Sequence, residues 1–135
     1  MEKIKLGDIF SFDTVYHQKD VEKFAEISGD NNPIHVNQEY ASKTPFGQCI
    51  VHGFFAGSVF SRVFGTIWPG EGTIYMMQEM SFRSPVFVER EYKANFKVVE
   101  LNEEKHRAVI ECVLEDSQSK PAIIGKAMLM NKERF

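Results

Sequence analysis

The segment from residue 52 to residue 68 constrains the fold most strongly, because apolar residues cover most of a helix circumference there. They are Phe54, Phe55, Ala56, Val59, Phe60, Val63, Phe64, Ile67 and Trp68. A helix that is apolar nearly all round must be buried. We therefore expect a helix over His52–Trp68 in the centre of the fold. It is shorter than the ~20 apolar residues that cross a bilayer, so we expect no membrane span.

After the turn at residues 69–72 the hydrophobic period changes from helical to alternating. One side of each segment is apolar: Ile74, Met76, Met80 and Phe82; then Tyr92, Ala94, Phe96 and Val98; then Ala108, Ile110, Cys112 and Leu114; and a last strand covers 122–130. Such alternation is typical of half-buried antiparallel strands. Short polar connections at 102–105 and 116–120 suit hairpins. We predict an α+β fold in which one antiparallel sheet wraps around the buried helix.

The N-terminal part adds a predicted strand over Ile9–Val15 and an amphipathic helix over Gln18–Ser28, which Gly29 would end. A short helix is expected over Asn37–Lys43. The chain has 135 residues, which suits a single domain over 1–135. Its net charge of -3, with acidic and basic residues interspersed, predicts no nucleic-acid partner. The exposed edges of an antiparallel sheet make self-association, as a homodimer or higher homo-oligomer, the expected state.

Asp30 and His35 flank a rigid Asn32-Pro33 step directly after the first predicted helix. Taken singly, each has a structural explanation, because Asp and Asn close turns and the residue before proline is held extended. Taken together, a carboxylate and an imidazole on one constrained turn can hold a water between a base and an acid. Histidine suits this work because its ordinary pKa lies near neutrality. This turn is the main candidate for catalysis.

Gly53, at the start of the long predicted helix, offers a second catalytic feature. The first N–H groups of a helix have no intrahelical acceptor, and the helix dipole favours negative charge there. Glycine also lets a carbonyl approach the backbone without meeting a Cβ. The alternative is a glycine needed only for packing. For the preceding residue, His52, we favour a cap or turn role.

The cysteines and histidines give no sign of a metal or redox site. Cys49 as a nucleophile, with His35 or His52 as its base, is less favoured than a buried small hydrophobe, and Cys112 lies in a strand core. The histidines (His17, His35, His52 and His106) do not recur at metal-ligand spacing, and no glycine-rich nucleotide loop is present. We expect no metal and no cofactor. Without a secretory signal at its N-terminus, the chain is expected in the cytoplasm.

The sequence resembles the MaoC-like (R)-specific enoyl-CoA hydratases and dehydratases of the hot-dog fold. The motif Asp-x-Asn-Pro-x-His of this family matches Asp30, Asn32, Pro33 and His35, preceded by the run at 24–29. The blocks at 41–53 and 80–88 are also similar, so the resemblance covers essentially the whole chain. Gln18 departs from the family, whose members often have a better helix-capping residue there.

The resemblance implies reversible hydration of a trans-2-enoyl-CoA to an (R)-3-hydroxyacyl-CoA, in fatty acid or hydroxyalkanoate metabolism. Asp30 and His35 would activate one water, and the Gly53 N–H would stabilise the thioester oxygen. Asn32 would orient the pair, and Ser61 would either add a hydrogen bond near the site or bond its own helix backbone. Coenzyme A would enter only as part of the substrate. For Arg83 a solvated strand-end role is favoured over contact with the coenzyme phosphates.

Two alternatives remain open. A 3-hydroxyacyl-[acyl-carrier-protein] dehydratase of fatty acid synthesis would use the same residues on a different carrier. A non-catalytic hot-dog module that binds acyl thioesters would not need a complete pair of Asp30 and His35, and both are present. Acyl chain length and carrier cannot be read from the sequence.

Overall fold

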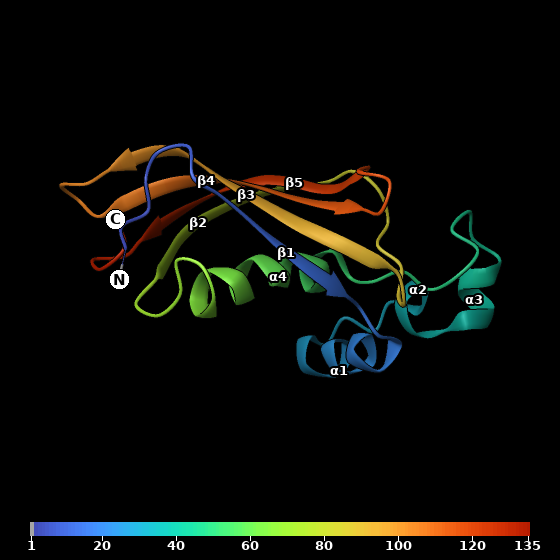
Figure 1. Ribbon diagram of the computed structural model, residues 1–135. Helices are drawn as coiled ribbons and strands as arrows, with labels where there is room; N and C mark the ends of the chain where they lie inside the picture. Colours follow the sequence, from blue (N-terminus) through green and yellow to red (C-terminus); the bar gives the residue numbers. More distant parts are fainter. Residues whose placement is uncertain (1) are drawn as a thin grey trace.

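The computed structural model describes residues 2–135 and contains one five-stranded antiparallel sheet in the order β1-β3-β4-β5-β2. Its strands are β1 (Ile9–Val15), β2 (Ile74–Phe82), β3 (Glu91–Asn102), β4 (Arg107–Asp116) and β5 (Pro121–Met130). Its helices are α1 (Gln18–Ser28), α2 (Pro33–Val36), α3 (Gln38–Ser42) and α4 (Gly53–Thr66). The sheet curves over α4, whereas α1, α2 and α3 gather toward one end (Figure 1). This is the α+β arrangement expected of a hot-dog fold.

The two central hairpin strands follow the predicted alternation closely. The inward residues of β3 (Tyr92, Ala94, Phe96 and Val98) and those of β4 (Ala108, Ile110, Cys112 and Leu114) are all buried. The residues between them in sequence point to the opposite, polar face of the sheet. One apolar face is therefore available to α4, and the alternating pattern was a correct guide to it.

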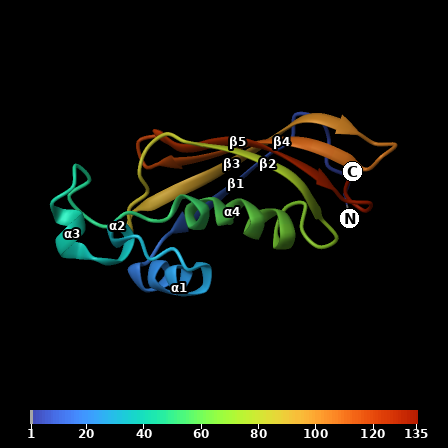
Figure 2. The ribbon, with the colours of Figure 1, turned by 180° about the vertical axis from the view of Figure 1, so that it is seen from behind.

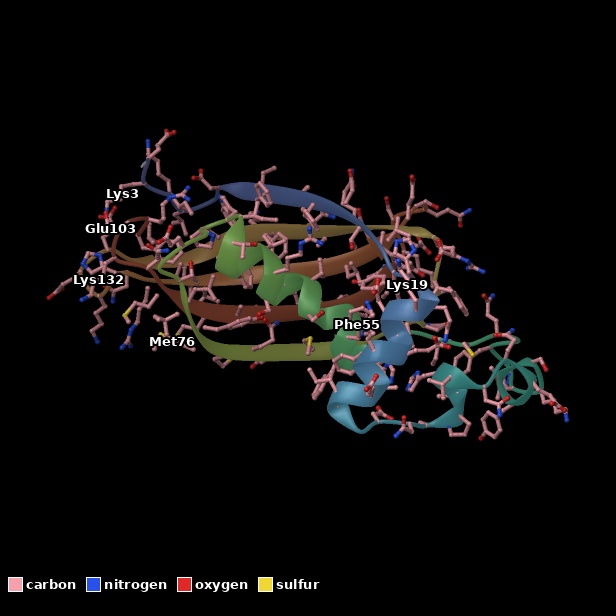
Figure 3. The ribbon with its side chains drawn as sticks, turned by 90° about the horizontal axis from the view of Figure 1, so that it is seen from below. Lys3, Lys19, Phe55, Met76, Glu103 and Lys132 are labelled. Atoms are coloured by element: carbon pink, nitrogen blue, oxygen red, sulfur yellow. The ribbon has the colours of Figure 1, made fainter. Side chains whose placement is uncertain are left out.

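Strand β2 departs from the prediction that Ile74, Met76, Met80 and Phe82 share one buried face. Its register with β5 shifts between Tyr75 and Met77, so Met76 is skipped in the pairing. Ile74, Met76 and Phe82 are exposed, and only Met80 packs partly against the core. The prediction is wrong because a bulge interrupts the period of two and because β2 is an edge strand. Met76 lies at this outer edge of the sheet (Figure 3).

Helix α4 lies across one face of the sheet (Figure 2) and ends at Thr66, two residues before the expected Trp68. Its buried residues are Ala56, Gly57, Val59, Phe60, Val63 and Phe64. The prediction that this helix is buried on all sides was wrong, because Phe54 on its first turn is 72% exposed. The sheet covers one side of the helix and leaves the other side open. None of the helices within residues 2–135 is long and apolar enough to cross a membrane.

Helix α1 packs against the start of α4 and so closes the end of the molecule that holds α2. Phe55, labelled between α4 and α1 in Figure 3, stacks on Phe24 with ring centroids 5.4 Å apart. Gly29 ends α1 with a left-handed φ of 80°, as predicted. Helix α3 matches the short helix expected over Asn37–Lys43, and the Asn37 side chain caps it by accepting from the Tyr40 N–H.

Candidate active site

The turn that carries Asp30 and His35 is held by its own short-range hydrogen bonds. The Asn32 N–H donates to Asp30 Oδ1 at 3.2 Å, and Asn32 Oδ1 accepts from the Ile34 N–H at 3.3 Å. Asn32 is thus the N-cap of α2, and Pro33 supplies its first residue, where a missing N–H costs nothing. The His35 N–H donates to the Asn32 carbonyl at 3.0 Å. The expectation that Asn32 orients the pair fits these contacts.

His35 is 8% exposed, and its imidazole is held in one tautomer. Its Nδ1 lies 2.8 Å from the carbonyl oxygen of Ile50, which can only accept a hydrogen bond. The proton is therefore on Nδ1, and Nε2 carries a free lone pair. Gln18 Nε2 donates to the His35 carbonyl at 2.8 Å, so the residue that departs from the family pattern helps to hold the turn that carries Asp30 and His35.

His52 occupies the N-cap position of α4, in agreement with the cap role that we favoured, and its main-chain carbonyl accepts from the Ala56 N–H, but its side chain binds elsewhere. It is 2% exposed, and its side chain makes no capping hydrogen bond to α4. Its Nε2 donates instead to the main-chain carbonyl of Asp30 at 3.0 Å. Its ring stacks on that of His35, with centroids 3.9 Å apart and planes inclined by 28°. Sequence reasoning considered His52 but missed these contacts, because they join segments about twenty residues apart.

One possible ligand atom from each of Asp30, His35 and His52 lies within 4.8 Å of the other two, which raises the question of a metal ion. Imidazole lone pairs lie in the ring plane, so two nearly parallel stacked rings do not converge on one ion. One nitrogen of each ring is also engaged by a carbonyl oxygen. The group does not suit a metal, and the expected absence of one stays a prediction.

A mostly apolar cavity of about 480 Å³ lies beside the turn that carries Asp30 and His35. His35 and Gly53 both line it, together with Phe46, Ile50, Val51, Ala56, Phe82, Arg83, Ser84, Pro85, Val86 and Ile123. Gly53 is the first residue of α4, so its N–H has no acceptor within the helix. Asp30 is exposed at the edge of this region and does not line the cavity. A cavity of this volume is large enough for an acyl thioester that contacts both His35 and the N-terminus of α4.

Phe82 is a second residue that the sequence did not point to. An added Cβ on Gly53 would lie 2.7 Å from a ring carbon of Phe82, closer than any normal contact. A side chain at position 53 would therefore have to displace the half-exposed Phe82 ring or shift the start of α4. At this position Gly53 can serve both as a glycine needed for packing and as a backbone hydrogen-bond donor.

The remaining candidates are the serine, the arginine and the two cysteines, of which only Arg83 also lines the cavity. Ser61 is exposed and does not line the cavity, although it is on the same helix as Gly53. Arg83 follows the end of β2, is exposed, and donates from Nε to Ser81 Oγ at 2.8 Å, as a solvated strand-end residue would. Cys49 is buried, and this burial raises the pKa of its thiol, which argues against a nucleophile. Cys112 is fully buried, as predicted.

The chain was compared with protein families, curated proteins and solved structures. Residues 7–119 match the family described as MaoC like domain. An (R)-specific enoyl-CoA hydratase from Aeromonas caviae is 33% identical over 95% of this chain and 96% of its own length. A 3-hydroxybutyryl-CoA dehydratase from Methylorubrum extorquens is 43% identical to this chain. The similar region covers 69% of this chain and 59% of that relative's length. A mitochondrial 3-hydroxyacyl-[acyl-carrier-protein] dehydratase from Arabidopsis thaliana is 33% identical over 79% of this chain and 63% of its length.

Solved structures of similar fold include hydratases. The (R)-hydratase from A. caviae involved in PHA biosynthesis superposes with a TM-score of 0.90 at 33% identity, covering 95% of this chain and 97% of the other. An R-hydratase from Pseudomonas aeruginosa in the unliganded form gives a TM-score of 0.89 at 30% identity, covering 95% and 82%. From the matched domain, the near full-length relative and the shared fold, we conclude that the chain belongs to the MaoC-like family of hot-dog hydratases and dehydratases, which are hydro-lyases.

Proposed function

We propose that this protein is an (R)-specific enoyl-CoA hydratase, which adds water reversibly to a trans-2-enoyl-CoA. The observation that carries the proposal is the pairing of Asp30 and His35 on one turn, beside the cavity that His35 and Gly53 line. The near full-length similarity to a hydratase of that name supports the choice of substrate class. Coenzyme A enters as part of the substrate, and the reaction needs no separate cofactor.

The chemistry assigns each group one task. A water molecule donates hydrogen bonds to the Asp30 carboxylate and to the free lone pair of His35 Nε2. As its oxygen bonds to C3 of the enoyl group, one proton passes to this pair, and the C2–C3 π electrons shift toward the thioester carbonyl. A proton from the same pair then bonds to C2, so that water is added across the double bond without a net change in the enzyme.

The enolate-like thioester oxygen that forms in this step needs a hydrogen-bond donor. The Gly53 N–H is suited to this because it is unpaired within α4 and lies at the positive end of the helix dipole. One such donor typically contributes about 3 kcal/mol to transition-state stabilisation. The apolar lining of the cavity excludes water around the oxygen, which strengthens the interaction.

The test is a hydration assay with purified protein and trans-2-enoyl-CoAs, starting with crotonyl-CoA. We expect loss of the enoyl-thioester absorbance and a product of (R) configuration at C3 by chiral analysis. A water held by Asp30 and His35 reaches only one face of a fixed thioester, and the family similarity selects (R). A predominantly (S) product would contradict the proposal even if turnover were fast.

Substituting Gly53 by Ala is expected to lower kcat/KM by about tenfold to a hundredfold. The new Cβ would either displace the Phe82 ring or shift the start of α4, and it would crowd the thioester oxygen. Steady-state kinetics with crotonyl-CoA measures the effect. Gly65→Ala on the same helix is the control, because a Cβ there meets no atom within 4 Å. Unchanged kinetics in Gly53→Ala would place the oxyanion donor elsewhere.

The carrier of the acyl group distinguishes two candidate activities. Because a relative named as an acyl-carrier-protein dehydratase is similar over 79% of this chain, acyl-carrier-protein thioesters are the second candidate substrates. The assay is therefore run with the same enoyl chain on both carriers. A non-catalytic binding module predicts that enoyl thioesters bind without any loss of absorbance.

We also propose that the protein is a homodimer that pairs through the free edge of β2. This edge strand exposes Ile74, Met76, Met77 and Phe82, and an unpaired apolar edge is a surface that proteins usually cover. Light scattering at micromolar concentration is expected to give twice the mass of the chain. Met76→Lys and Met77→Lys together should weaken the association, and a monomeric wild-type protein would contradict the proposal.

A further inference from the structure

His52 touches both members of the catalytic pair, yet the proposed reaction assigns it no step. Its Nε2–H donates to the Asp30 carbonyl at 3.0 Å, so it holds the main chain of the residue that carries the carboxylate. Its ring stacks on the His35 ring at 3.9 Å between centroids. The buried His52 side chain therefore contacts the backbone of Asp30 and the side chain of His35.

The surroundings of His52 keep the imidazole neutral and fixed. Burial lowers the pKa of His52, and nearby His35 lowers it further, although the bond to the Asp30 carbonyl acts in the opposite direction. Phe24 packs against the ring with centroids 4.8 Å apart. The neutral ring has its one proton on Nε2, where the carbonyl of Asp30 accepts it.

The other nitrogen gives an independent reason to regard His52 as more than packing. His52 Nδ1 is buried and has no hydrogen-bond partner within residues 2–135. A buried acceptor without a partner lowers stability, whereas an apolar ring of similar size would fill the same space without that cost. The imidazole therefore has a cost in stability that an apolar ring would not have, and the one hydrogen bond that its side chain makes is the bond to Asp30.

We propose that His52 is a positioning residue, whose hydrogen bond fixes the Asp30 backbone while its ring fixes the plane of His35. The Asp30 carboxylate is exposed and is tied to the turn by the Asn32 N–H, so its direction depends on where its own backbone is held. Misplacing a catalytic group by about 1 Å can lower the rate by about a hundredfold. This role rests on the proposed hydratase activity, although the geometry can be tested without it.

Two substitutions separate the two contacts. His52→Phe keeps a ring against His35 and Phe24 but removes the donor to Asp30, whereas His52→Gln keeps a side-chain N–H of similar reach and removes the ring. We expect His52→Phe to lower kcat by about tenfold to a hundredfold with little change in KM. His52→Gln keeps the donor and should lose less activity than His52→Phe, and the loss that remains measures the contribution of the ring contact with His35. The control is His106→Asn, which keeps a donor to the Phe135 carbonyl far from the site and should retain full activity.

A readout that does not require turnover is the NMR signal of the Asn32 amide, which bonds to the Asp30 carboxylate. This resonance should shift in His52→Phe and stay at its wild-type position in His52→Gln. Melting temperatures of both variants exclude unfolding as the cause. Wild-type kcat in His52→Phe, an unmoved Asn32 amide, or equal kcat losses in both variants would overturn the positioning role. An inactive wild-type protein with the expected amide shifts would instead refute the hydratase activity alone.

Discussion

Asp30→Asn and His35→Ala are each expected to lower kcat by about 100-fold to 10,000-fold while the protein stays folded. The physical reason is the loss of a positioned acid or base from a reaction that moves two protons. The amide introduced by Asp30→Asn would keep an oxygen that accepts from the Asn32 N–H, so the turn would keep its local bonds while the carboxylate charge is removed. Steady-state hydration kinetics, with circular dichroism spectra of both variants, measures the effect.

His35→Asn is the matched control for the histidine. An asparagine amide N–H can replace the Nδ1–H that donates to the Ile50 carbonyl, but it supplies no group at the position of Nε2. The variant should therefore be as stable as the wild type and as inactive as His35→Ala. Combining Asp30→Asn with His35→Asn should cost little more than either alone, because the two residues act on the same water. Wild-type kcat in any of these variants would remove the catalytic assignment.

Gly125→Ala is expected to destabilise the protein by about 3 kcal/mol, the largest effect on stability that the structure predicts for a single added methyl group. Gly125 lies in β5, opposite Met80 of β2 and Cys112 of β4. Its added Cβ would overlap the backbone carbonyl oxygen of Glu79. Backbone atoms cannot rotate away as a side chain can, so β2 would have to separate from β5.

The matched control is the same substitution in α4. Gly65→Ala places its Cβ in open space and replaces a poor helix former, so it should stabilise the fold by about 0.5–1 kcal/mol. Urea denaturation of the two variants and the wild type compares the free energies of unfolding. Equal stabilities for Gly125→Ala and the wild type would show that the β2–β5 pairing is looser than the structure indicates.

The parts of this protein that were predictable from sequence are those set by local patterns. A period of two in β3 and β4 places alternate side chains on one face whatever the rest of the chain does. The turn from Asp30 to His35 is likewise local, since Asn32 and Pro33 impose it through bonds that span a few residues. The first residue of a helix has a free N–H by construction, which is why Gly53 could be singled out.

The features that the sequence did not disclose depend on contacts between distant segments. The bulge in β2 arises from its pairing with β5, so the alternation of Ile74 and Met76 was misleading. The tautomer of His35 is decided by the Ile50 carbonyl, and the role of His52 by the carbonyl of Asp30. Hydrogen bonds of this kind leave no periodic trace in a sequence, because the partner is a backbone atom that every residue has. The residue types and the local turn thus suggested which groups could carry the proposed chemistry, whereas the packing of α2 against the segment that precedes α4 decided which nitrogen of His35 is free.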